Sequence, residues 1–268
     1  MILDQWLKQA TNNLKVANIG SARLDALILL EDEIGRDRAW ILAHPEYEIL
    51  AESLKKLNKR LARRKAHEPL AYIREKTEFY GRDFYVDSRV LEPRPESETM
   101  IDMLKRLRLP ITTKIADVGA GSGALGITAA LEIPRAVADF YDIDPDTLAV
   151  AEQNAKNYRL FSRYFHSDLL QQAPFSYDVV LANLPYVPAR HQINRAASHE
   201  PAVAIFGGGD GLNSYHRLFE QIKKLPWQPT YVFTESLPPQ HTNLSRLATD
   251  AGYKLKETQD FIQLFESA

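Results

Sequence analysis

The 268-residue sequence contains no cysteine, which excludes disulfide bonds, thiolate nucleophiles and cysteine–zinc sites. It also lacks an excess of either charge: 33 Lys and Arg residues stand against 35 Asp and Glu residues, so a generally basic nucleic-acid coat is not expected. No apolar run approaches the roughly 18 residues of a spanning helix, and residues 1–16 mix acidic and polar residues into their apolar pattern, unlike a secretory signal. We therefore expect a cytoplasmic protein with no membrane contact and, at 45% hydrophobic residues, a sizeable core.

Glycine is sparse, and its placement is uneven. Of the 12 glycines, four fall within residues 119–126 and four within residues 207–211, with none between these windows. Glycine is used where the backbone turns in an unusual way or approaches another group closely. These two windows are therefore the first places to search for a functional site.

Residues 1–75 have the apolar spacing of a helical domain. Two helix-spaced stripes are present, Leu24, Leu27, Ile28 and Ile34, and then Leu50, Leu54, Leu57 and Leu61. Seven basic residues lie between Lys55 and Lys65 without an acid among them. On a helix most of them point away from the leucines, so this run is either a solvated face or a contact surface for an acidic partner or RNA.

The remainder of the chain indicates an α/β protein. Residues 76–95 carry aromatic and β-branched residues around Gly81, typical of a β-hairpin linker. Residues 96–268 then alternate strands with helices, which predicts a doubly wound, seven-stranded, Rossmann-like parallel sheet with an antiparallel pair at its end. The expected strands are 114–118, 136–142, 163–166, 177–183, 230–234, 252–257 and 261–265, and the main helices are 122–132, 145–157, 212–224 and 239–251.

A glycine-rich turn follows the first expected strand of this sheet. Residues 116–126 read ADVGAGSGALG. Glycines let the backbone approach a ligand closely, and free amides at the start of a helix favour an anionic group. Gly121, Gly123 and Gly126 also match the dinucleotide-binding fingerprint formally. This turn alone therefore does not distinguish between nucleotide-like cofactors, or exclude a tight turn without a ligand.

Acidic residues follow each of the next two strands. Asp142 stands about 20 residues after the glycines, where a carboxylate can accept hydrogen bonds from both hydroxyls of a ribose, as carried by NAD and by S-adenosylmethionine. Asp144 competes for this role, but it can instead cap the helix that begins at Pro145. Asp168 can accept from an exocyclic adenine amine while Leu169 packs on the ring, or it can be a helix cap or a loop acid.

The segment that decides between these cofactors is Asn183-Leu184-Pro185-Tyr186, which follows the apolar strand DVVLA. A dehydrogenase has no evident use for it, whereas methyl transfer to a planar nitrogen does. Such a nitrogen has two N–H donors in one plane; the Asn183 side-chain oxygen can accept one and the Leu184 carbonyl the other. Pro185 favours an extended backbone at Leu184. Tyr186 can pack on a flat substrate, a kind of stacking that contributes roughly 1–3 kcal/mol with bases.

With the glycine-rich turn before it, this tetrapeptide resembles that of S-adenosylmethionine-dependent methyltransferases, whose nitrogen-methylating members carry Asn or Asp, two prolines and an aromatic residue. Over nearly its whole length the chain is similar to the peptide chain release factor glutamine N5-methyltransferase family. SARLDALILL, GRDRAWILAHPE and EPLAYI resemble that family's N-terminal helical domain, EFYGRDFYVDSRVLEPRPESE its hairpin and Pro-Arg-Pro stretch, and FGGGDGLNSY its glycine-rich segment.

The resemblance implies methyl transfer from S-adenosylmethionine, leaving S-adenosylhomocysteine, to the glutamine of the Gly-Gly-Gln loop of class-1 release factors. It implies that residues 1–75 recognise the substrate and that residues 96–268 form the methyltransferase domain. The implied cofactor contacts are Asp117, Gly119, Ala120, Gly121, Ser122, Gly123, Asp142, Asp168, Leu169 and Asn183. The implied substrate contacts are Arg94 and the tetrapeptide, whose residues Asn183, Leu184, Pro185 and Tyr186 form the catalytic set. We expect a monomer, and the seven scattered histidines offer no metal site.

The chain departs from the family's pattern in places that keep a second function open. Leu184 replaces the usual first proline, and Asn-Leu-Pro-Tyr is also the form seen in ribosomal RNA adenine dimethyltransferases. An RNA or DNA adenine N6-methyltransferase is therefore the main rival hypothesis. Glu92 replaces an apolar residue, residues 234–241 replace a glycine-containing turn although Glu235 and Gln240 are retained, and the tail lacks an Asp-Arg pair. An NAD-dependent dehydrogenase and a silent module that binds a release factor are two further hypotheses.

Overall fold

The computed structural model describes residues 1–268, which divide into two compact units. The first unit comprises residues 1–76 together with residues 194–199, and the second comprises residues 77–193 and 200–268. No helix in either unit combines the length and the apolar character that a membrane span requires. Nothing in the sequence indicates that residues 194–199, which lie within the α/β half of the chain, belong to the first unit.

The first unit is a bundle of helices around one apolar core. Its long helices are α1 (Leu3–Val16), α2 (Ala22–Ile34) and α4 (Ala51–Lys65), and its short ones are α3 (Arg38–Ala43) and α5 (Leu70–Arg74). The core includes Trp6, Leu14, Leu30 and Leu57. The indole nitrogen of Trp6 donates to Asn58 Oδ1 at 2.9 Å, so the one polar atom of this buried ring is satisfied.

The apolar stripes predicted for this unit are right only in part. Leu57 and Leu61 are buried as expected, but Leu24 is 45% exposed, and Leu50, which precedes the first residue of α4, is 70% exposed. Leu30 is fully buried although it lies outside the predicted stripe. The reason is that α2 contacts α1, α3, α4 and α5, and it therefore buries a broader face than a single stripe.

The basic run at 55–65 is partly matched by acids of its own unit. Arg64 Nε donates to Asp25 Oδ2 at 2.7 Å, and Arg63 Nε donates to Glu68 Oε2 at 2.8 Å. Such pairs lower the positive charge available to an outside partner. The structure therefore favours a solvated, internally paired helix face over a nucleic-acid surface.

The second unit begins with an antiparallel hairpin of β1 (Thr77–Phe79) and β2 (Arg82–Phe84). Tyr80 and Gly81 form the turn with φ values of +53° and +68°, a conformation that glycine adopts readily. The hairpin expected around Gly81 is thus confirmed. The short 3-10 helix η1 (Pro95–Ser97) then leads into α6 (Glu98–Lys105).

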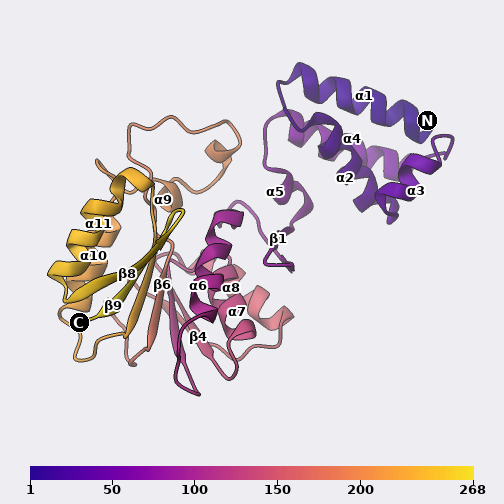
Figure 1. Cartoon of the computed structure of the whole chain (residues 1–268). Helices are drawn as coiled ribbons and strands as arrows, with labels where there is room; N and C mark the ends of the chain where they lie inside the picture. Colours follow the sequence, from indigo (N-terminus) through magenta and orange to yellow (C-terminus); the bar gives the residue numbers. More distant parts are fainter. The chain divides into compact units, whose positions relative to one another are not determined.

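A seven-stranded sheet follows, in the order β5-β4-β3-β6-β7-β9-β8 (Figure 1). The strands are β3 (Lys114–Val118), β4 (Val137–Asp142), β5 (Tyr164–His166), β6 (Val179–Ala182), β7 (Tyr231–Glu235), β8 (Tyr253–Gln259) and β9 (Ile262–Ser267). Strands β3 to β7 are parallel, and β8 and β9 form an antiparallel hairpin at one edge. The predicted doubly wound sheet with its terminal pair is therefore confirmed.

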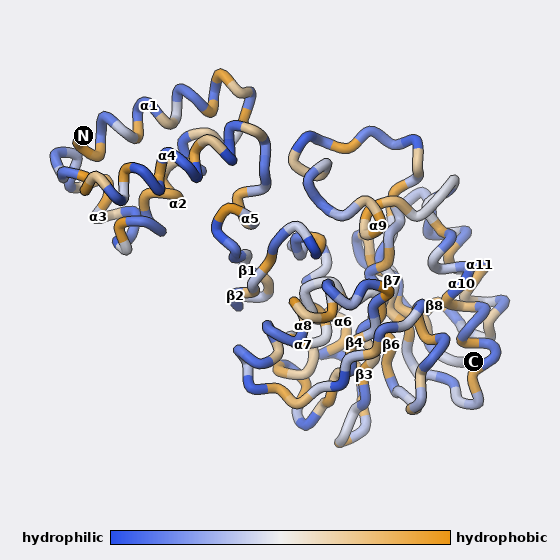
Figure 2. The backbone as a smooth tube through the Cα atoms, turned by 180° about the vertical axis from the view of Figure 1, so that it is seen from behind, coloured by the Kyte–Doolittle hydropathy of each residue, from blue (hydrophilic) through white to orange (hydrophobic).

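Helices cover both faces of this sheet. In Figure 1, α6, α7 (Ala124–Glu132) and α8 (Pro145–Asn157) lie on one side, and α10 (Asn213–Ile222) and α11 (His241–Asp250) lie on the other. The buried apolar side chains accordingly form two clusters, to which alternate strand residues such as Leu181 and Val180 contribute. Apolar and polar stretches alternate along the helices in Figure 2, as expected where one side faces a core.

The order of the strands reverses at β3, which has β4 on one side and β6 on the other. Val118 pairs with Tyr141 of β4 and with Ala182 of β6, so the turns after these three strands leave the sheet at one edge. Ligands of open α/β sheets bind outside the carboxyl ends of the strands at such a switch point.

Candidate active site

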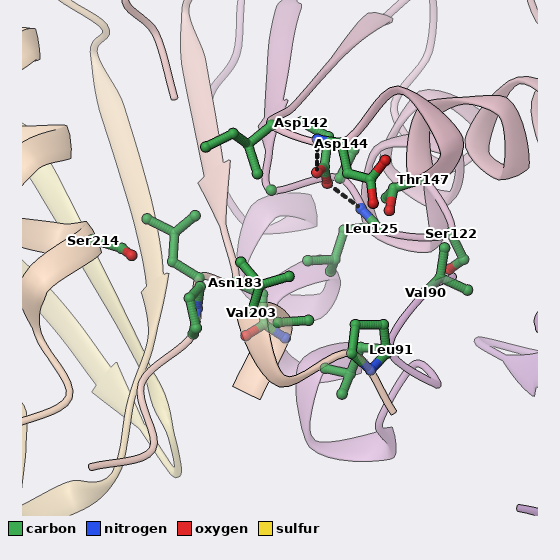
Figure 3. A pocket seen from close by; sticks show the side chains of 18 of the residues that line it. Val90, Leu91, Ser122, Leu125, Asp142, Asp144, Thr147, Asn183, Val203 and Ser214 are labelled. Atoms are coloured by element: carbon green, nitrogen blue, oxygen red, sulfur yellow. Dashed lines mark hydrogen bonds between the residues drawn. The ribbon is translucent and has the colours of Figure 1, made fainter. Parts of the chain in front are cut away.

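A cavity of about 240 Å³ lies at this edge of the sheet. Its wall is formed by the turns after β3, β4, β5 and β6, and by two further segments within residues 89–97 and 201–206. In Figure 3, Asp142 and Asp144 lie together, apart from Asn183. No group of three or more His, Asp or Glu side chains is arranged to hold a metal ion.

The glycine-rich turn after β3 needs its glycines for backbone conformation. Gly119, Gly121 and Gly123 have φ values of +72°, +56° and +78°, which side chains rarely adopt. The amides of Gly119 and Ala120 donate to the carbonyl oxygen of Tyr141 at 2.8 and 3.0 Å, which ties the turn to β4. Residues 119–122 all line the cavity, in agreement with their predicted positions.

Gly123 and Asp117, in contrast, lie outside the cavity wall. A Cβ atom on Gly123 would lie 3.2 Å from Ala151 Cβ, so this glycine allows α7 to approach α8. Asp117 is 1% exposed, and its Oδ2 accepts from the amide of Gly126 at 2.8 Å. Burial raises the pKa of Asp117 to about 7. Both residues support the conformation of the turn, and the direct cofactor contacts expected of them stay predictions.

Asp142 ends β4 with its carboxylate held by two backbone amides. Its Oδ2 accepts from the backbone amide of Gly121, and its Oδ1 accepts from the backbone amide of Asp144, both at 3.1 Å (Figure 3). Burial raises the pKa of Asp142, and these donors act in the opposite direction. Asp144 lines the cavity too, but its Oδ1 accepts from the backbone amide of Asp146 at 2.9 Å. Asp144 thereby caps the N-terminus of α8. Asp142 is therefore the acid available to a ribose.

Asp168 and Leu169 follow β5 and line the cavity. The Asp168 carboxylate forms an ion pair with Arg217 of α10, which also lines the cavity. Gln221 of the same helix donates to the Asp168 carbonyl at 3.1 Å and accepts from Leu170 at 2.8 Å. Arg217 was not a predicted site residue, because nothing in its local sequence shows that α10 faces the end of β5.

The tetrapeptide after β6 places its first three residues at the cavity. Asn183 Nδ2 donates to Ser97 Oγ at 3.0 Å, while Asn183 Oδ1 accepts no hydrogen bond within the chain. Leu184 is 2% exposed, and its amide donates to the Tyr215 hydroxyl at 3.2 Å. A proline at this position would lack that donor. The departure at Leu184 thus creates a hydrogen bond that the usual family residue cannot form.

Pro185 lines the cavity, whereas Tyr186 does not. The Tyr186 hydroxyl donates to Glu235 Oε1 at 3.0 Å, and its carbonyl accepts from Gln240 Nε2 at 2.8 Å. Burial, followed by the nearby Glu235 charge, raises the pKa of Tyr186 above its usual range. The Tyr186 hydroxyl therefore contacts Glu235, and the packing of the Tyr186 ring on the substrate stays a prediction.

The second glycine window packs against this tetrapeptide. A Cβ atom on Gly207 would collide with the carbonyl oxygens of Gly211 and Pro185, and one on Gly211 would collide with the carbonyl of Tyr186. The amide of Gly207 also donates to Val187 at 2.9 Å. Residues 207–211 therefore lie directly on the backbone of the tetrapeptide and hold it in place.

Arg94 does not line the cavity. Its Nη2 donates to both carboxylate oxygens of Glu200, at 2.8 and 2.6 Å. Glu200 is 7% exposed and directly precedes the cavity-lining residue Pro201. Arg94 thus anchors the segment 201–206, and its contact with the substrate stays a prediction.

Known proteins share both parts of this architecture. A family model described as the PrmC N-terminal domain matches residues 5–74, and one described as a methyltransferase small domain matches residues 96–201. A release factor glutamine methyltransferase from Koribacter versatilis is 36% identical over 228 residues, covering 83% of this chain and 81% of that protein. One from Coxiella burnetii is 32% identical over 254 residues, covering 92% of each.

Solved structures match the chain with much lower sequence identity. A methyltransferase from Pyrococcus furiosus has a TM-score of 0.52 at 14% identity, covering 81% of this chain and 97% of that one. The hMettl16 catalytic domain has a TM-score of 0.55 at 13% identity, covering 81% and 82%. The doubly wound sheet is thus the Rossmann-like fold of methyltransferases. The sequence relatives are more specific, and the chain belongs to the release factor glutamine methyltransferase family.

Proposed function

We propose that the chain transfers a methyl group from S-adenosylmethionine to the side-chain amide nitrogen of the glutamine in the Gly-Gly-Gln loop of class-1 peptide chain release factors. Family membership supports the reaction type. The observation that carries the proposal is the position of Asn183, whose Oδ1 accepts no hydrogen bond within the chain and which lines the same cavity as Asp142.

The residues of the cavity fit the cofactor. The Asp142 carboxylate suits the ribose hydroxyls, and Leu169 suits a flat adenine ring. Gly121 lines the cavity, and a Cβ atom there would meet no atom within 4 Å, so the turn leaves room for a ligand. When bound, S-adenosylmethionine supplies a methyl group on a positively charged sulfur and leaves as S-adenosylhomocysteine.

The tetrapeptide then acts on the substrate amide. Asn183 Oδ1 and the Leu184 carbonyl are two acceptors without partners in the chain, and each can bind one N–H of the glutamine NH₂ group. Correct orientation of two reacting groups contributes on the order of 7–11 kcal/mol at best. In the transfer, the bond from the methyl carbon to sulfur would break as the bond to the amide nitrogen forms, and one amide proton would leave to water. The same acceptors favour the charge that develops on nitrogen during transfer.

Two acceptors also give selectivity against a carboxylate. The glutamate side chain offers no N–H donor and places negative oxygens against Asn183 Oδ1. Sites built to bind a donor reject analogues that lack it by about 10⁴–10⁵. This argument favours glutamine over glutamate but does not separate an amide from an adenine amine, which has the same two donors.

We also propose that the first unit recognises the release factor. Support comes from its separate core and from its match to the PrmC N-terminal domain over residues 5–74. Residues 194–199 belong to this unit, where His199 Nε2 lies 3.2 Å from the Ala66 carbonyl oxygen.

The test is incubation of the purified protein with isotope-labelled S-adenosylmethionine and a class-1 release factor, RNA or DNA. One added methyl on the glutamine of the Gly-Gly-Gln loop is expected by mass analysis, with no label on nucleic acid. Asn183→Ala should abolish turnover and leave cofactor affinity nearly unchanged. Methylation of RNA or DNA adenine without methylation of the release factor would establish an adenine N6-methyltransferase instead.

A further inference from the structure

A chain of hydrogen bonds runs from Asn183 through Ser97, which also lines the cavity, to Glu235. Asn183 Nδ2 lies 3.0 Å from Ser97 Oγ, Ser97 Oγ lies 2.5 Å from Glu235 Oε2, and the Tyr186 hydroxyl lies 3.0 Å from Glu235 Oε1. Ser97 and Glu235 are 2% and 1% exposed, so water does not compete for these contacts. Neither residue carries an expected role from its local sequence.

While Glu235 is ionised, the protons of this chain can be arranged in one way only. An ionised carboxylate accepts hydrogen bonds and donates none, and a serine hydroxyl has a single proton. Because Ser97 gives its proton to Glu235, Ser97 Oγ can only accept from Asn183. The NH₂ end of the Asn183 amide must therefore face Ser97, and its oxygen must face the other way.

We propose that Ser97 and Glu235 are positioning residues that determine which end of the Asn183 amide faces the cavity, and that they thereby select an amide over a carboxylate as methyl acceptor. This inference rests on the proposed function. An asparagine side chain is nearly symmetric in shape, so packing alone distinguishes its two ends poorly. A fixed direction of hydrogen bonding behind it distinguishes them by the full cost of an unsatisfied polar group.

Hydrogen-bond donors favour the ionised form of Glu235 that this arrangement requires, whereas burial opposes it. Burial raises the pKa of Glu235, the hydroxyls of Ser97 and Tyr186 lower it, the charge of Glu96 raises it, and the Asn183 side chain lowers it. The Tyr215 hydroxyl contacts Glu235 through its backbone and not through its carboxylate, and it lies 2.5 Å from the Glu235 carbonyl oxygen. The donors to the carboxylate therefore come from the tetrapeptide itself and from Ser97.

The decisive variant is Glu235→Gln, which keeps the shape and adds a donor. If the new amide oxygen continues to accept from Tyr186, its NH₂ group faces Ser97. Ser97 then donates to Asn183, and the Asn183 amide turns its NH₂ end toward the cavity. For the natural glutamine substrate we expect kcat to fall on the order of 100-fold, with cofactor affinity within about twofold of wild type.

The measurement that separates a positioning role from a general loss of structure is the preference for glutamine over glutamate in the release factor loop. A release factor whose loop glutamine is replaced by glutamate should inhibit wild-type protein weakly, because two acceptors face its carboxylate. In Glu235→Gln, an N–H donor faces the glutamate carboxylate. We expect the inhibition constant of the release factor with glutamate to fall about tenfold relative to the KM of the release factor with glutamine, which corresponds to one hydrogen bond to a charged group.

Asp139→Asn is the matched control, because Asp139 is also a buried acid that accepts from a tyrosine, with Tyr177 at 2.8 Å, yet this partner lies outside the tetrapeptide. It should leave kcat and the glutamate inhibition unchanged. A second variant, Ser97→Ala, removes the only acceptor for Asn183 Nδ2 outside Glu235 and should lower kcat about tenfold without changing cofactor affinity.

The inference is overturned if Glu235→Gln and Asp139→Asn behave alike, or if both site variants lose cofactor binding in proportion to activity. Failure of the wild-type protein to methylate any release factor is a different result, since it removes the proposed function and this inference together. Should Glu235→Gln not fold, the kcat and cofactor affinity of Ser97→Ala decide the matter.

Discussion

Gly119 and Leu184 approach so closely that a Cβ atom on Gly119 would lie 2.8 Å from Leu184 Cδ2. The contact joins the turn after β3 to the turn after β6. These turns carry the proposed cofactor and substrate contacts respectively, so the two halves of the site share one packed interface. A substitution in one of these turns therefore alters the packing of the other.

Gly119→Ala should destabilise the protein more than Gly121→Ala. Both glycines have positive φ, but a Cβ atom on Gly121 would meet nothing within 4 Å. The alanine at 119 overpacks Leu184, which typically costs about 1–3 kcal/mol. Urea unfolding without ligand measures the difference. Equal losses in the two variants would show that Leu184 moves aside freely.

Asp142→Asn should weaken binding of S-adenosylhomocysteine about 10- to 100-fold, because hydrogen bonds to a charged group contribute roughly 1.5–3 kcal/mol. Asp144→Asn is the control, since asparagine is also a good N-cap and Asp144 caps α8. Calorimetric titration measures both affinities. A similar loss in both variants would refute the distinct roles of the two aspartates.

The same carboxylate predicts a pH dependence of cofactor binding. Ribose hydroxyls donate to the ionised form, so protonation of Asp142 removes the interaction. Burial raises the pKa of Asp142, and affinity should therefore begin to fall at a higher pH than for an ordinary aspartate. Titrations at several acidic pH values test this, and Asp142→Asn should flatten the profile.

Asp117, which lies in β3 before the glycine-rich turn, predicts a pH dependence of the stability of the protein. Its pKa is 3.8 when unperturbed and about 7 in the folded protein. The contribution of protonated Asp117 to the free energy of unfolding is therefore complete below pH 3.8. It is lost as the pH rises to about 7, because Asp117 in the unfolded chain releases its proton at a lower pH than in the folded protein. Asp117→Asn keeps an oxygen for the Gly126 amide but cannot ionise. Relative to wild type, the variant should gain more than about 1 kcal/mol between pH 5 and pH 8. Parallel denaturation curves would contradict this.

Tyr215→Phe should lower both stability and turnover. The buried Tyr215 hydroxyl lies 3.1 Å from the Ala182 carbonyl, 3.2 Å from the Leu184 amide and 2.5 Å from the Glu235 carbonyl. It therefore links the ends of β6 and β7, and its loss leaves buried polar groups unsatisfied at a cost of about 1–3 kcal/mol.

Tyr253→Phe is the matched control for that substitution. Tyr253 is buried like Tyr215, and its hydroxyl donates to the Pro229 carbonyl at 2.9 Å, a partner outside the tetrapeptide. Both variants should unfold at lower urea concentrations, whereas only Tyr215→Phe should lower kcat. If kcat is unchanged in Tyr215→Phe, the hydroxyl has no influence on the tetrapeptide.

Several features of the fold and the site were predictable because they depend on neighbours in sequence. The strand Lys114–Val118 and the helix Pro145–Asn157 have the predicted ends, since β-branched residues, a cap and a proline mark them locally. The cavity positions of Asp142 and Asn183 followed as well, because residues directly after parallel strands meet at one edge.

Other features depend on contacts between distant segments, and only the tertiary structure decided them. Ser97 is 138 residues from Glu235 and 86 residues from Asn183. No periodicity or spacing indicates that these three side chains meet, because their approach follows from how η1, β6 and β7 pack. For the same reason, the burial of Asp117, whose carboxylate accepts from the Gly126 amide of α7, could not be predicted from the sequence. The amino-acid order thus determined which chemical groups reach the end of the sheet, while the direction of each hydrogen bond there was decided by the folded chain around it.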